Sequence, residues 1–262
     1  MASFEELKSL SSAPGAVCTT TGCTGVEVYF IPHLNAYLKV GAIGKVSDLF
    51  REMEMLAWLN GRAQVPHFID YASDSQREAL LISAIEGRPL SEILAEGSNC
   101  LVSETLIEKA AAALSTLHRI QIEECPFGTR LDWRFARAKR NAELHLLSET
   151  DEEFGAEHDG KLPLEILSEL DGRRPVTEDL VFTHGDPSLP NIIFDNGEFN
   201  GFIDLDGAGV ADRYVDISIF LRSVRYNARG KTEFIEAFCR GYGIASLDPN
   251  LIEFYTLIDD LF

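Results

Sequence analysis

Residues 181–206 hold the side chains whose types and spacing are best suited to chemistry. Residues 181–183 form an apolar run that predicts a short buried strand, and the turn-forming triplet His184-Gly185-Asp186 follows it. The carboxylate of Asp186 should therefore be exposed beyond the strand end, where it could act on a bound molecule.

A hairpin is predicted directly after this turn. Asn191 opens an apolar run, Asn196-Gly197 is typical of a tight two-residue turn, and residues 199–203 return as a second strand. The return should bring Asp204 beside Asn191. Two carboxylates and one amide oxygen would then lie at the same end of a small sheet, an arrangement suited to phosphoryl transfer.

The ligand preferences of hard cations support this interpretation. Mg²⁺ prefers oxygen ligands and usually takes one or two carboxylates from a protein, with nucleotide phosphates completing its coordination. Asn191 and Asp204 can supply that minimum. Asp186, set back from the metal, could accept the proton of an attacking hydroxyl group, which is the role of the catalytic-loop aspartate in protein kinases.

The spacing of these residues resembles that of a known family. His184-Gly185-Asp186, four residues, Asn191 and then Gly201-Phe202-Ile203-Asp204 are similar to the catalytic and metal-binding motifs of the aminoglycoside phosphotransferases, small relatives of protein kinases. The resemblance is greatest to their 3′-O-phosphotransferase branch. It extends to residues 125–127, 211–214, 216–217 and 257–262, and so spans most of the chain.

This resemblance implies a two-lobed, protein-kinase-like α+β fold with the active site between the lobes. Residues 1–85 would form a small nucleotide-binding lobe with an antiparallel sheet. Residues 86–262 would form a larger, mainly helical lobe for catalysis and substrate binding. The boundary is placed where an apolar strand, residues 79–82, runs into the sequence Ser-Ala-Ile-Glu-Gly-Arg-Pro.

The reaction implied is ATP-dependent phosphorylation of an aminoglycoside such as kanamycin or neomycin, first at its 3′-hydroxyl, which would inactivate the antibiotic. Asp186 would be the base, and Asn191 and Asp204 would bind Mg²⁺. The sequence leaves GTP open as the nucleotide. Two alternatives stay open: a kinase of another small hydroxyl compound, and a catalytically inactive nucleotide-binding interaction module.

An ion pair is predicted in the N-terminal part. Residues 36–40 alternate like a strand that places Lys39 on the same face as Tyr37, and residues 46–59 have helical apolar spacing and carry Glu52. A lysine on an inward strand face needs a partner, so we expect Lys39 to pair with Glu52. In kinases, which the resemblance takes as relatives, the matching pair holds the lysine against the nucleotide phosphates. Taken singly, each residue would be an ordinary surface charge.

Further nucleotide contacts follow mainly from the resemblance. The main chain of Ser83 and Ile85 would contact the adenine edge, and Tyr37 would pack against the adenine ring, with ordinary strand packing as the alternative. Thr24 belongs to a Thr- and Gly-rich break, residues 20–25, that could fold over a triphosphate. Such a break is more often a simple hairpin loop.

Acidic residues are expected on the acceptor side. Residues 149–159 are the most acidic stretch, which ordinarily indicates a solvated loop, but the resemblance assigns Glu153 and Glu157 to drug ammonium groups. At the C-terminus it likewise assigns Asp259, Asp260 and the free carboxylate of Phe262. Exposed ion pairs contribute roughly 0.2–1 kcal/mol each, so several would have to converge.

Composition limits the partners. The 262-residue chain has a formal net charge of −19, which argues against nucleic-acid or anionic-membrane binding and permits a cationic ligand. Its five cysteines lack metal-site spacing and are expected to be thiols. The start has no basic segment followed by an apolar one, so a cytoplasmic protein is expected. We also expect a monomer or weak dimer.

Several helices with supporting roles are predicted. His118, near the end of a helix over residues 103–120, should be a capping or packing residue. A helix over residues 133–147 should present its basic residues as a solvated face. Asp216 should anchor the loop before it, and His184 should orient that loop. The predicted ranges of the remaining helices are 216–229, 232–242 and 249–261.

One position departs from the resemblance. After Asp204 the 3′-branch continues with a glycine and an arginine, whereas this chain has Leu205-Asp206-Gly207-Ala208. The arginine is missing and an acid is gained. We interpret Asp206 as a surface acid; an additional metal ligand and a contact to a cationic acceptor are the alternatives.

Overall fold

The computed structural model describes residues 2–21, 25–44, 48–97, 100–144, 160–227 and 232–261. Contacts divide the chain into two compact units, Met1–Pro89 with Asn191–Gly207, and Leu90–Pro190 with Ala208–Phe262. The segment Asn191–Gly207, which contains the hairpin, thus belongs to the first unit. The sequence predicts a boundary between residues 85 and 86, which assigns this segment to the C-terminal lobe. That boundary stays a prediction, and each unit is described by itself.

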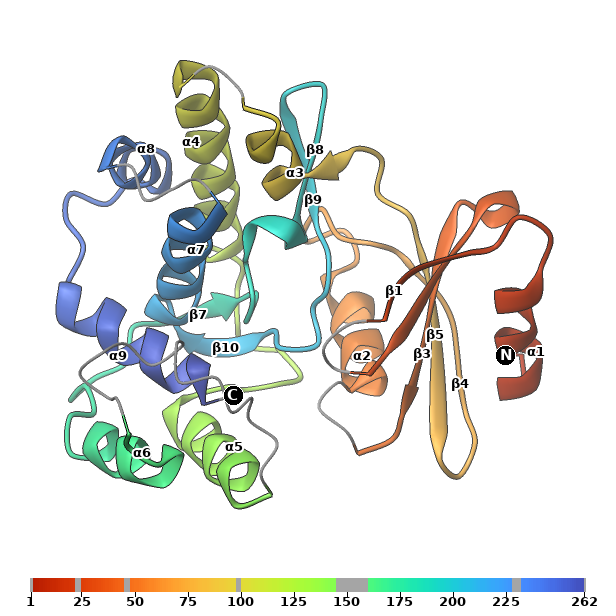
Figure 1. Ribbon diagram of the computed structural model, residues 1–262, viewed down its shortest axis with the longest axis horizontal. Coiled ribbons are helices and arrows are strands. Elements are labelled where there is room, and N and C mark those ends of the chain that lie inside the picture. Colours follow the sequence, from red (N-terminus) through yellow and green to blue (C-terminus); the bar gives the residue numbers. More distant parts are fainter. Residues whose placement is uncertain are drawn as a thin grey trace. The chain divides into compact units, whose positions relative to one another are not determined.

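A five-stranded antiparallel sheet forms the first unit, in the order β1-β2-β3-β5-β4. Helix α1 lies on one face and helix α2 on the other (Figure 1). Short 3-10 turns, η1 (Leu10–Ser12) and η2 (Pro32–Leu34), connect the early elements. The elements are α1 (Phe4–Ser9), β1 (Val17–Thr21), β2 (Glu27–Ile31), β3 (Ala36–Ala42), α2 (Leu49–Leu59), β4 (Phe68–Ser73) and β5 (Arg77–Ser83).

Strand alternation sorts the side chains between the two faces of this sheet. Leu38 and Leu81 are paired across β3 and β5 and belong to the buried cluster that contains Phe4 and Leu7 of α1. Because successive side chains of a strand point to opposite faces, Lys39 lies on the other face, the one that α2 covers.

The predicted hairpin is confirmed. Strands β8 (Ile192–Asp195) and β9 (Glu198–Phe202) are antiparallel, and β6 (Arg88–Pro89) completes a small sheet of order β6-β8-β9. Both turn residues have positive φ, 49° at Asn196 and 79° at Gly197. A two-residue turn of this kind matches the twist of the strands it joins.

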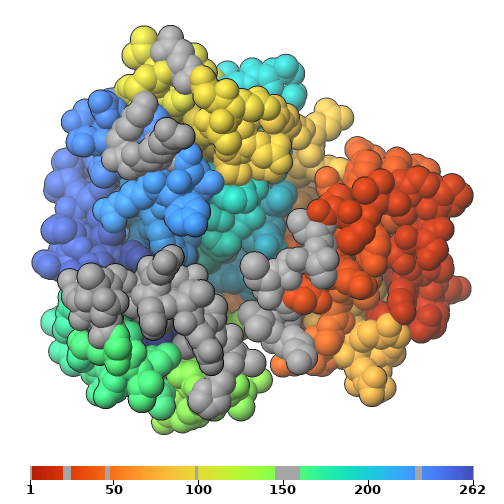
Figure 2. Space-filling model, viewed as in Figure 1, coloured from red at the N-terminus to blue at the C-terminus, as the bar shows by residue number. Residues whose placement is uncertain are grey.

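The second unit is mainly helical and also contains a two-stranded sheet of β7 and β10. Helix α7 is buried along most of its length. Helices α5 and α6 are neighbours and form adjoining surfaces in Figure 2. The elements are α3 (Leu90–Ala95), α4 (Cys100–Leu117), α5 (Leu131–Glu143), α6 (Pro163–Asp171), β7 (Leu180–Thr183), η4 (Leu189–Asn191), β10 (Gly209–Asp212), α7 (Tyr214–Asn227), α8 (Thr232–Tyr242) and α9 (Pro249–Asp260).

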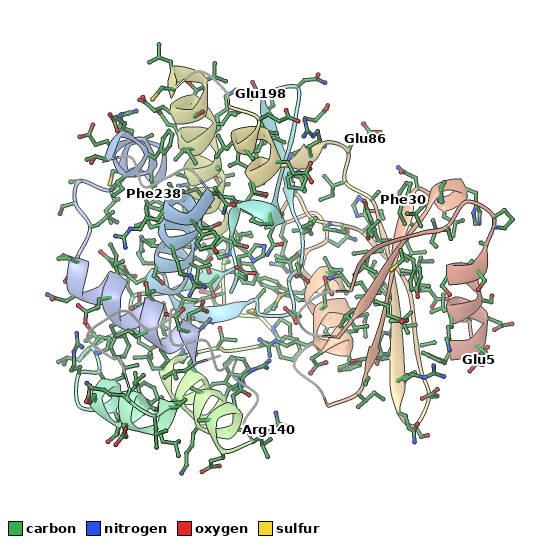
Figure 3. All side chains as sticks on the ribbon, in the orientation of Figure 1. Glu5, Phe30, Glu86, Arg140, Glu198 and Phe238 are labelled. Carbon is green, nitrogen blue, oxygen red and sulfur yellow. The ribbon has the colours of Figure 1, made fainter. Side chains whose placement is uncertain are left out.

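Aromatic side chains join α8 to α7. Phe238, labelled in Figure 3, is fully buried, and its ring centroid lies 4.9 Å from that of Phe220 on α7. The ring of Tyr242 stacks on that of Phe238, with the centroids 5.4 Å apart and an interplanar angle of 15°. The Phe220–Phe238 pair stabilises the contact between α7 and α8 beyond the area that it buries, and Tyr242 is buried beside it.

The predicted solvated face of α5 is wrong at Arg134, which is only 2% exposed. Its burial is tolerated because Arg134 Nε donates to the carbonyl of Thr129 at 3.2 Å, and its guanidinium lies 4.0 Å from Asp259. Arg137 is half-buried beside the Trp133 ring. The two remaining basic residues of this face, Lys139 and Arg140, are exposed as expected.

No helix in the described ranges is both long and apolar enough to cross a membrane.

Candidate active site

The predicted ion pair between Lys39 and Glu52 is present in the first unit. Lys39 Nζ lies 2.8 Å from both carboxylate oxygens of Glu52. The side chains are 12% and 1% exposed, so the pair is largely shielded from water. Shielding strengthens the attraction between the two charges but also removes both from water, so the loss of either partner would leave the other buried and uncompensated.

Lys39 also binds Asp204, with Nζ 2.7 Å from Oδ1 of the carboxylate. The backbone of Asp204 has φ = 65°, in the left-handed region that residues other than glycine rarely adopt. The backbone on either side is held: Ile203 N donates to the carbonyl of Asn191 at 3.0 Å, and Arg51 Nε donates to the carbonyl of Asp206 at 2.7 Å. Asp204 therefore returns beside Asn191, as the hairpin predicts.

The protonation of this cluster follows from its charges. Burial opposes the charged form of Lys39, but Asp204 and Glu52 together raise the pKa of Lys39 well above its ordinary value. Burial raises the pKa of Glu52 to about 7, opposed by Lys39 and reinforced by the charges of Asp204 and Asp206. Lys39 thus stays protonated, and its two bonds to Glu52 favour the ionised carboxylate.

Asp206 is half-buried, so it is not a simple surface acid. Its charge raises the pKa of Glu52, and its carbonyl accepts the bond from Arg51. The preceding residue, Leu205, is buried and directs its N–H toward Glu52 at 3.5 Å. Three consecutive residues of the loop are therefore held by Lys39 or by α2.

The oxygen donors fit a magnesium ion that is shared with a nucleotide. The Asp204 side chain is 50% exposed and carries a carboxylate, and Asn191 offers an amide oxygen. Within the described ranges, no group of three or more His, Cys, Asp and Glu side chains is placed to hold a metal ion. Phosphate oxygens would have to complete the coordination, which is the usual arrangement for Mg²⁺ in such sites.

The residues expected at the adenine lie at one end of the five-stranded sheet. Tyr37 is paired with Phe30 on the neighbouring strand, with ring centroids 5.2 Å apart. The N–H of Ser83 already donates to the carbonyl of His67 at 2.9 Å, so a nucleotide would have to use another main-chain group of this segment. Thr24 lies outside the described residues.

Ile85 rests on Gly201 of β9. A Cβ added at Gly201 would lie 2.6 Å from Ile85 Cδ1 and 2.9 Å from the carbonyl oxygen of Gln64. The isoleucine could rotate away, but the backbone oxygen of Gln64 accepts the N–H of Phe202 at 2.9 Å and is fixed. Only glycine fits here without displacing Ile85.

Gly201→Ala should therefore raise KM for ATP several-fold and destabilise the protein by about 1–3 kcal/mol, the usual cost of overpacking. Steady-state kinetics and thermal unfolding would measure the two effects. Gly172→Ala is the matched control, because a Cβ there meets its nearest atom at an ordinary 3.5 Å. Equal KM values for ATP in both variants would show that Ile85 does not contribute to the nucleotide site.

In the second unit, Asp186 is exposed on the loop after β7, and a buried acid holds that loop. Asp216 on α7 is 0% exposed and accepts the N–H groups of His184 at 2.7 Å and Gly185 at 2.9 Å. His184 Nδ1 lies 3.2 Å from Asp186 N. Asp216 is thus the anchor expected from the sequence, and His184 contacts the backbone of Asp186.

His118 is a buried packing residue, as predicted, and it extends this network. Its Nε2 lies 2.9 Å from Asp216 Oδ2, and its Nδ1 lies 2.6 Å from the hydroxyl of Tyr242. Sequence reasoning did not find the contact to Tyr242, because 124 residues separate the two. The network connects α4 and α8 to the loop that carries Asp186.

The acidic residues of α9 are paired within the protein. Arg222 on α7 contacts Asp259 at 2.5 Å and also binds Asp260, and the two acidic side chains are only 15% and 9% exposed. Burial opposes the charge of Arg222, but Asp259, Asp260 and Asp186 raise its pKa. Glu153, Glu157 and Phe262 lie outside the described residues. The substrate-binding roles of all five acidic positions stay predictions.

Relatives of known activity match this chain along nearly its whole length. The profile of the phosphotransferase enzyme family matches residues 27–254. An aminoglycoside 3′-phosphotransferase from Niallia circulans is 34% identical over 98% of this chain and 97% of its own. Another, from Enterococcus faecalis, is 32% identical over the same shares.

Solved structures agree with this comparison. The aminoglycoside phosphotransferase APH(3″)-Id from Streptomyces rimosus has a TM-score of 0.83 at 27% identity, over 100% of this chain and 99% of its own. A type VIII aminoglycoside 3′-phosphotransferase has a TM-score of 0.81 at 27% identity, over 98% of each chain.

The antiparallel sheet with its lysine–glutamate pair, the mainly helical second unit and these likenesses define a kinase-like phosphotransferase. The chain belongs to the phosphotransferase enzyme family. Relatives named aminoglycoside 3′-phosphotransferase are among those that it matches. The α+β, kinase-like fold and the family predicted from the sequence are confirmed.

Proposed function

We propose that this enzyme transfers the γ-phosphoryl group of ATP to the 3′-hydroxyl of an aminoglycoside such as kanamycin or neomycin, and so inactivates the antibiotic. The single observation that carries the proposal is Lys39, bonded to both Glu52 and Asp204 at 2.7–2.8 Å. That arrangement suits a lysine that holds nucleotide phosphates. The relatives named aminoglycoside 3′-phosphotransferase support the acceptor.

Each residue has a role in the proposed reaction. Lys39, oriented by Glu52, binds phosphate oxygens. Asn191 and Asp204 would hold Mg²⁺, which would neutralise charge on the phosphates. Asp186 takes the proton of the attacking hydroxyl as the new O–P bond forms and ADP leaves.

The remaining roles concern binding. For the nucleotide, the main chain of Ser83 and Ile85, the ring of Tyr37 and the loop residue Thr24 are proposed contacts. For the ammonium groups of the acceptor, the proposed contacts are Glu153, Glu157, Asp259, Asp260 and Phe262.

A second candidate changes only the acceptor and its hydroxyl. The Streptomyces rimosus relative is a 3″-enzyme, and its complex with ADP and streptomycin superposes on this chain with a TM-score of 0.80. Streptomycin phosphorylated at a 3″-hydroxyl is therefore the alternative acceptor.

An acceptor panel tests the proposal. Kanamycin, neomycin, a 3′-deoxy aminoglycoside and streptomycin are each assayed with Mg-ATP and Mg-GTP, and the phosphorylated position is determined by NMR. We expect turnover of kanamycin and neomycin and little of the 3′-deoxy compound. Turnover of streptomycin alone would favour the 3″ alternative. Nucleotide binding without turnover of any acceptor would favour an interaction module.

A further inference from the structure

Glu78 is a buried acid that the proposed reaction does not use. It lies on β5, is 4% exposed, and its Oε1 accepts the N–H of Leu49 at 3.1 Å. Its Oε2 accepts the N–H of Phe50 and the hydroxyl of Tyr71, both at 3.0 Å. Burying a carboxylate is costly unless donors surround it. These donors therefore fix where the Glu78 side chain lies.

The two backbone donors are the first two residues of α2. The first N–H groups of a helix have no partner within the helix and must be satisfied from outside. Asp48, the residue before α2, accepts the N–H of Arg51 through its side chain at 2.9 Å. Glu78 supplies the acceptors that this local cap does not, and its charge suits the positive end of the helix dipole.

The strand register relates this contact to Lys39. Lys39 is paired with Leu80 across β3 and β5. Residues two apart on a strand share a face, so Glu78 and Lys39 lie on the face that α2 covers. Glu52 is three residues beyond Leu49, a rise of about 4.5 Å along the helix. Helix α2 is thus attached to one sheet face at its first residues and again about one turn later.

We infer that Glu78 is a positioning residue for the nucleotide site: it fixes the start of α2 on the sheet, and so sets where Glu52 holds Lys39. The inference rests on the proposed function, in which Lys39 binds phosphate. Tyr71 reinforces the attachment, since its ring packs edge-on against Phe50 with centroids 5.8 Å apart. Burial and the bond to Glu78 raise the pKa of Tyr71 to about 12, so its hydroxyl remains a donor.

The test compares Glu78→Gln with Asp48→Ala by calorimetric titration of Mg-ADP and by thermal unfolding. The amide of Glu78→Gln can accept only one of the two helix N–H groups and faces the other with its own NH₂. We expect its Kd for Mg-ADP to rise about tenfold, the equivalent of one charge-assisted hydrogen bond. Asp48→Ala removes a hydrogen bond at the same helix end whose donor, Arg51 N, belongs to α2 itself, and it leaves the bonds from Glu78 in place. It should lower Tm but change Kd by less than about twofold.

Each result supports or overturns the inference. Equal Kd values for wild type and Glu78→Gln would overturn it, as would an equal loss of affinity in both variants at equal loss of Tm. If wild type itself does not bind Mg-ADP, the proposed function fails and the inference fails with it. Should Glu78→Gln not fold, Tyr71→Phe removes a single donor and must still weaken Mg-ADP binding measurably.

Discussion

Replacing Asp186 with asparagine should lower kcat for kanamycin phosphorylation by about 100-fold to 10,000-fold, the usual contribution of a positioned general base. Asparagine has nearly the same size but cannot take the proton of the acceptor hydroxyl. The loop itself should keep its shape, because its anchors are bonds from the backbone of His184 and Gly185 to Asp216. Steady-state kinetics with Mg-ATP measure the effect.

The asparagine variant should leave the Kd for Mg-ADP and the Tm close to their wild-type values. Asp195→Asn is the matched control, since Asp195 is another exposed aspartate and has no proposed role. A kcat that is essentially unchanged in Asp186→Asn would show that another group serves as the base.

Replacing Asp216 with asparagine should affect both stability and catalysis. The amide would direct an NH₂ group at donors that now bind a carboxylate, so we expect a loss of about 3 kcal/mol in the free energy of unfolding. Because the displaced backbone belongs to His184 and Gly185, kcat should also fall, although Asp216 is buried and touches no substrate. Chemical unfolding and kinetics would measure these effects.

The pH dependence of this stability difference has a definite sign. Burial alone would raise the pKa of Asp216, but the hydrogen bond and charge of His118, together with those of His184, hold it below the ordinary value of an aspartate. A carboxyl group with a lowered pKa stabilises the protein above its unfolded-state pKa, and this stability is lost as pH falls through the folded-state pKa. The difference between wild type and Asp216→Asn should therefore shrink as the pH falls below the ordinary pKa of an aspartate. A difference that grows in acid would contradict the assignment.

Local patterns were sufficient to predict much of this site. Asn196-Gly197 specifies its hairpin within two residues, and the strand and helix periods around Lys39 and Glu52 place both side chains on facing surfaces. In each case the pattern lies within about one element of the residue concerned.

Long-range pairs could not be predicted in the same way. Glu78 caps a helix that begins 29 residues earlier, and His118 meets Asp216 98 residues away. The charge of Arg134 suggested solvent, but its partners, the carbonyl of Thr129 and Asp259, lie in the interior. Such contacts cannot be predicted from the periodicity of the sequence, because they depend on how separate elements pack.

The pairing of Arg222 with Asp259 and Asp260 has a consequence for acceptor recognition under the proposed function. To bind these carboxylates, an ammonium group of the acceptor would have to displace the guanidinium of Arg222. The selectivity of this surface would then depend on the difference between two cation contacts, so a small monocation would gain little by displacing the arginine. An acceptor with several ammonium groups on a rigid ring could bind both carboxylates at once. Competition with Arg222 would therefore favour polycationic acceptors over monocations.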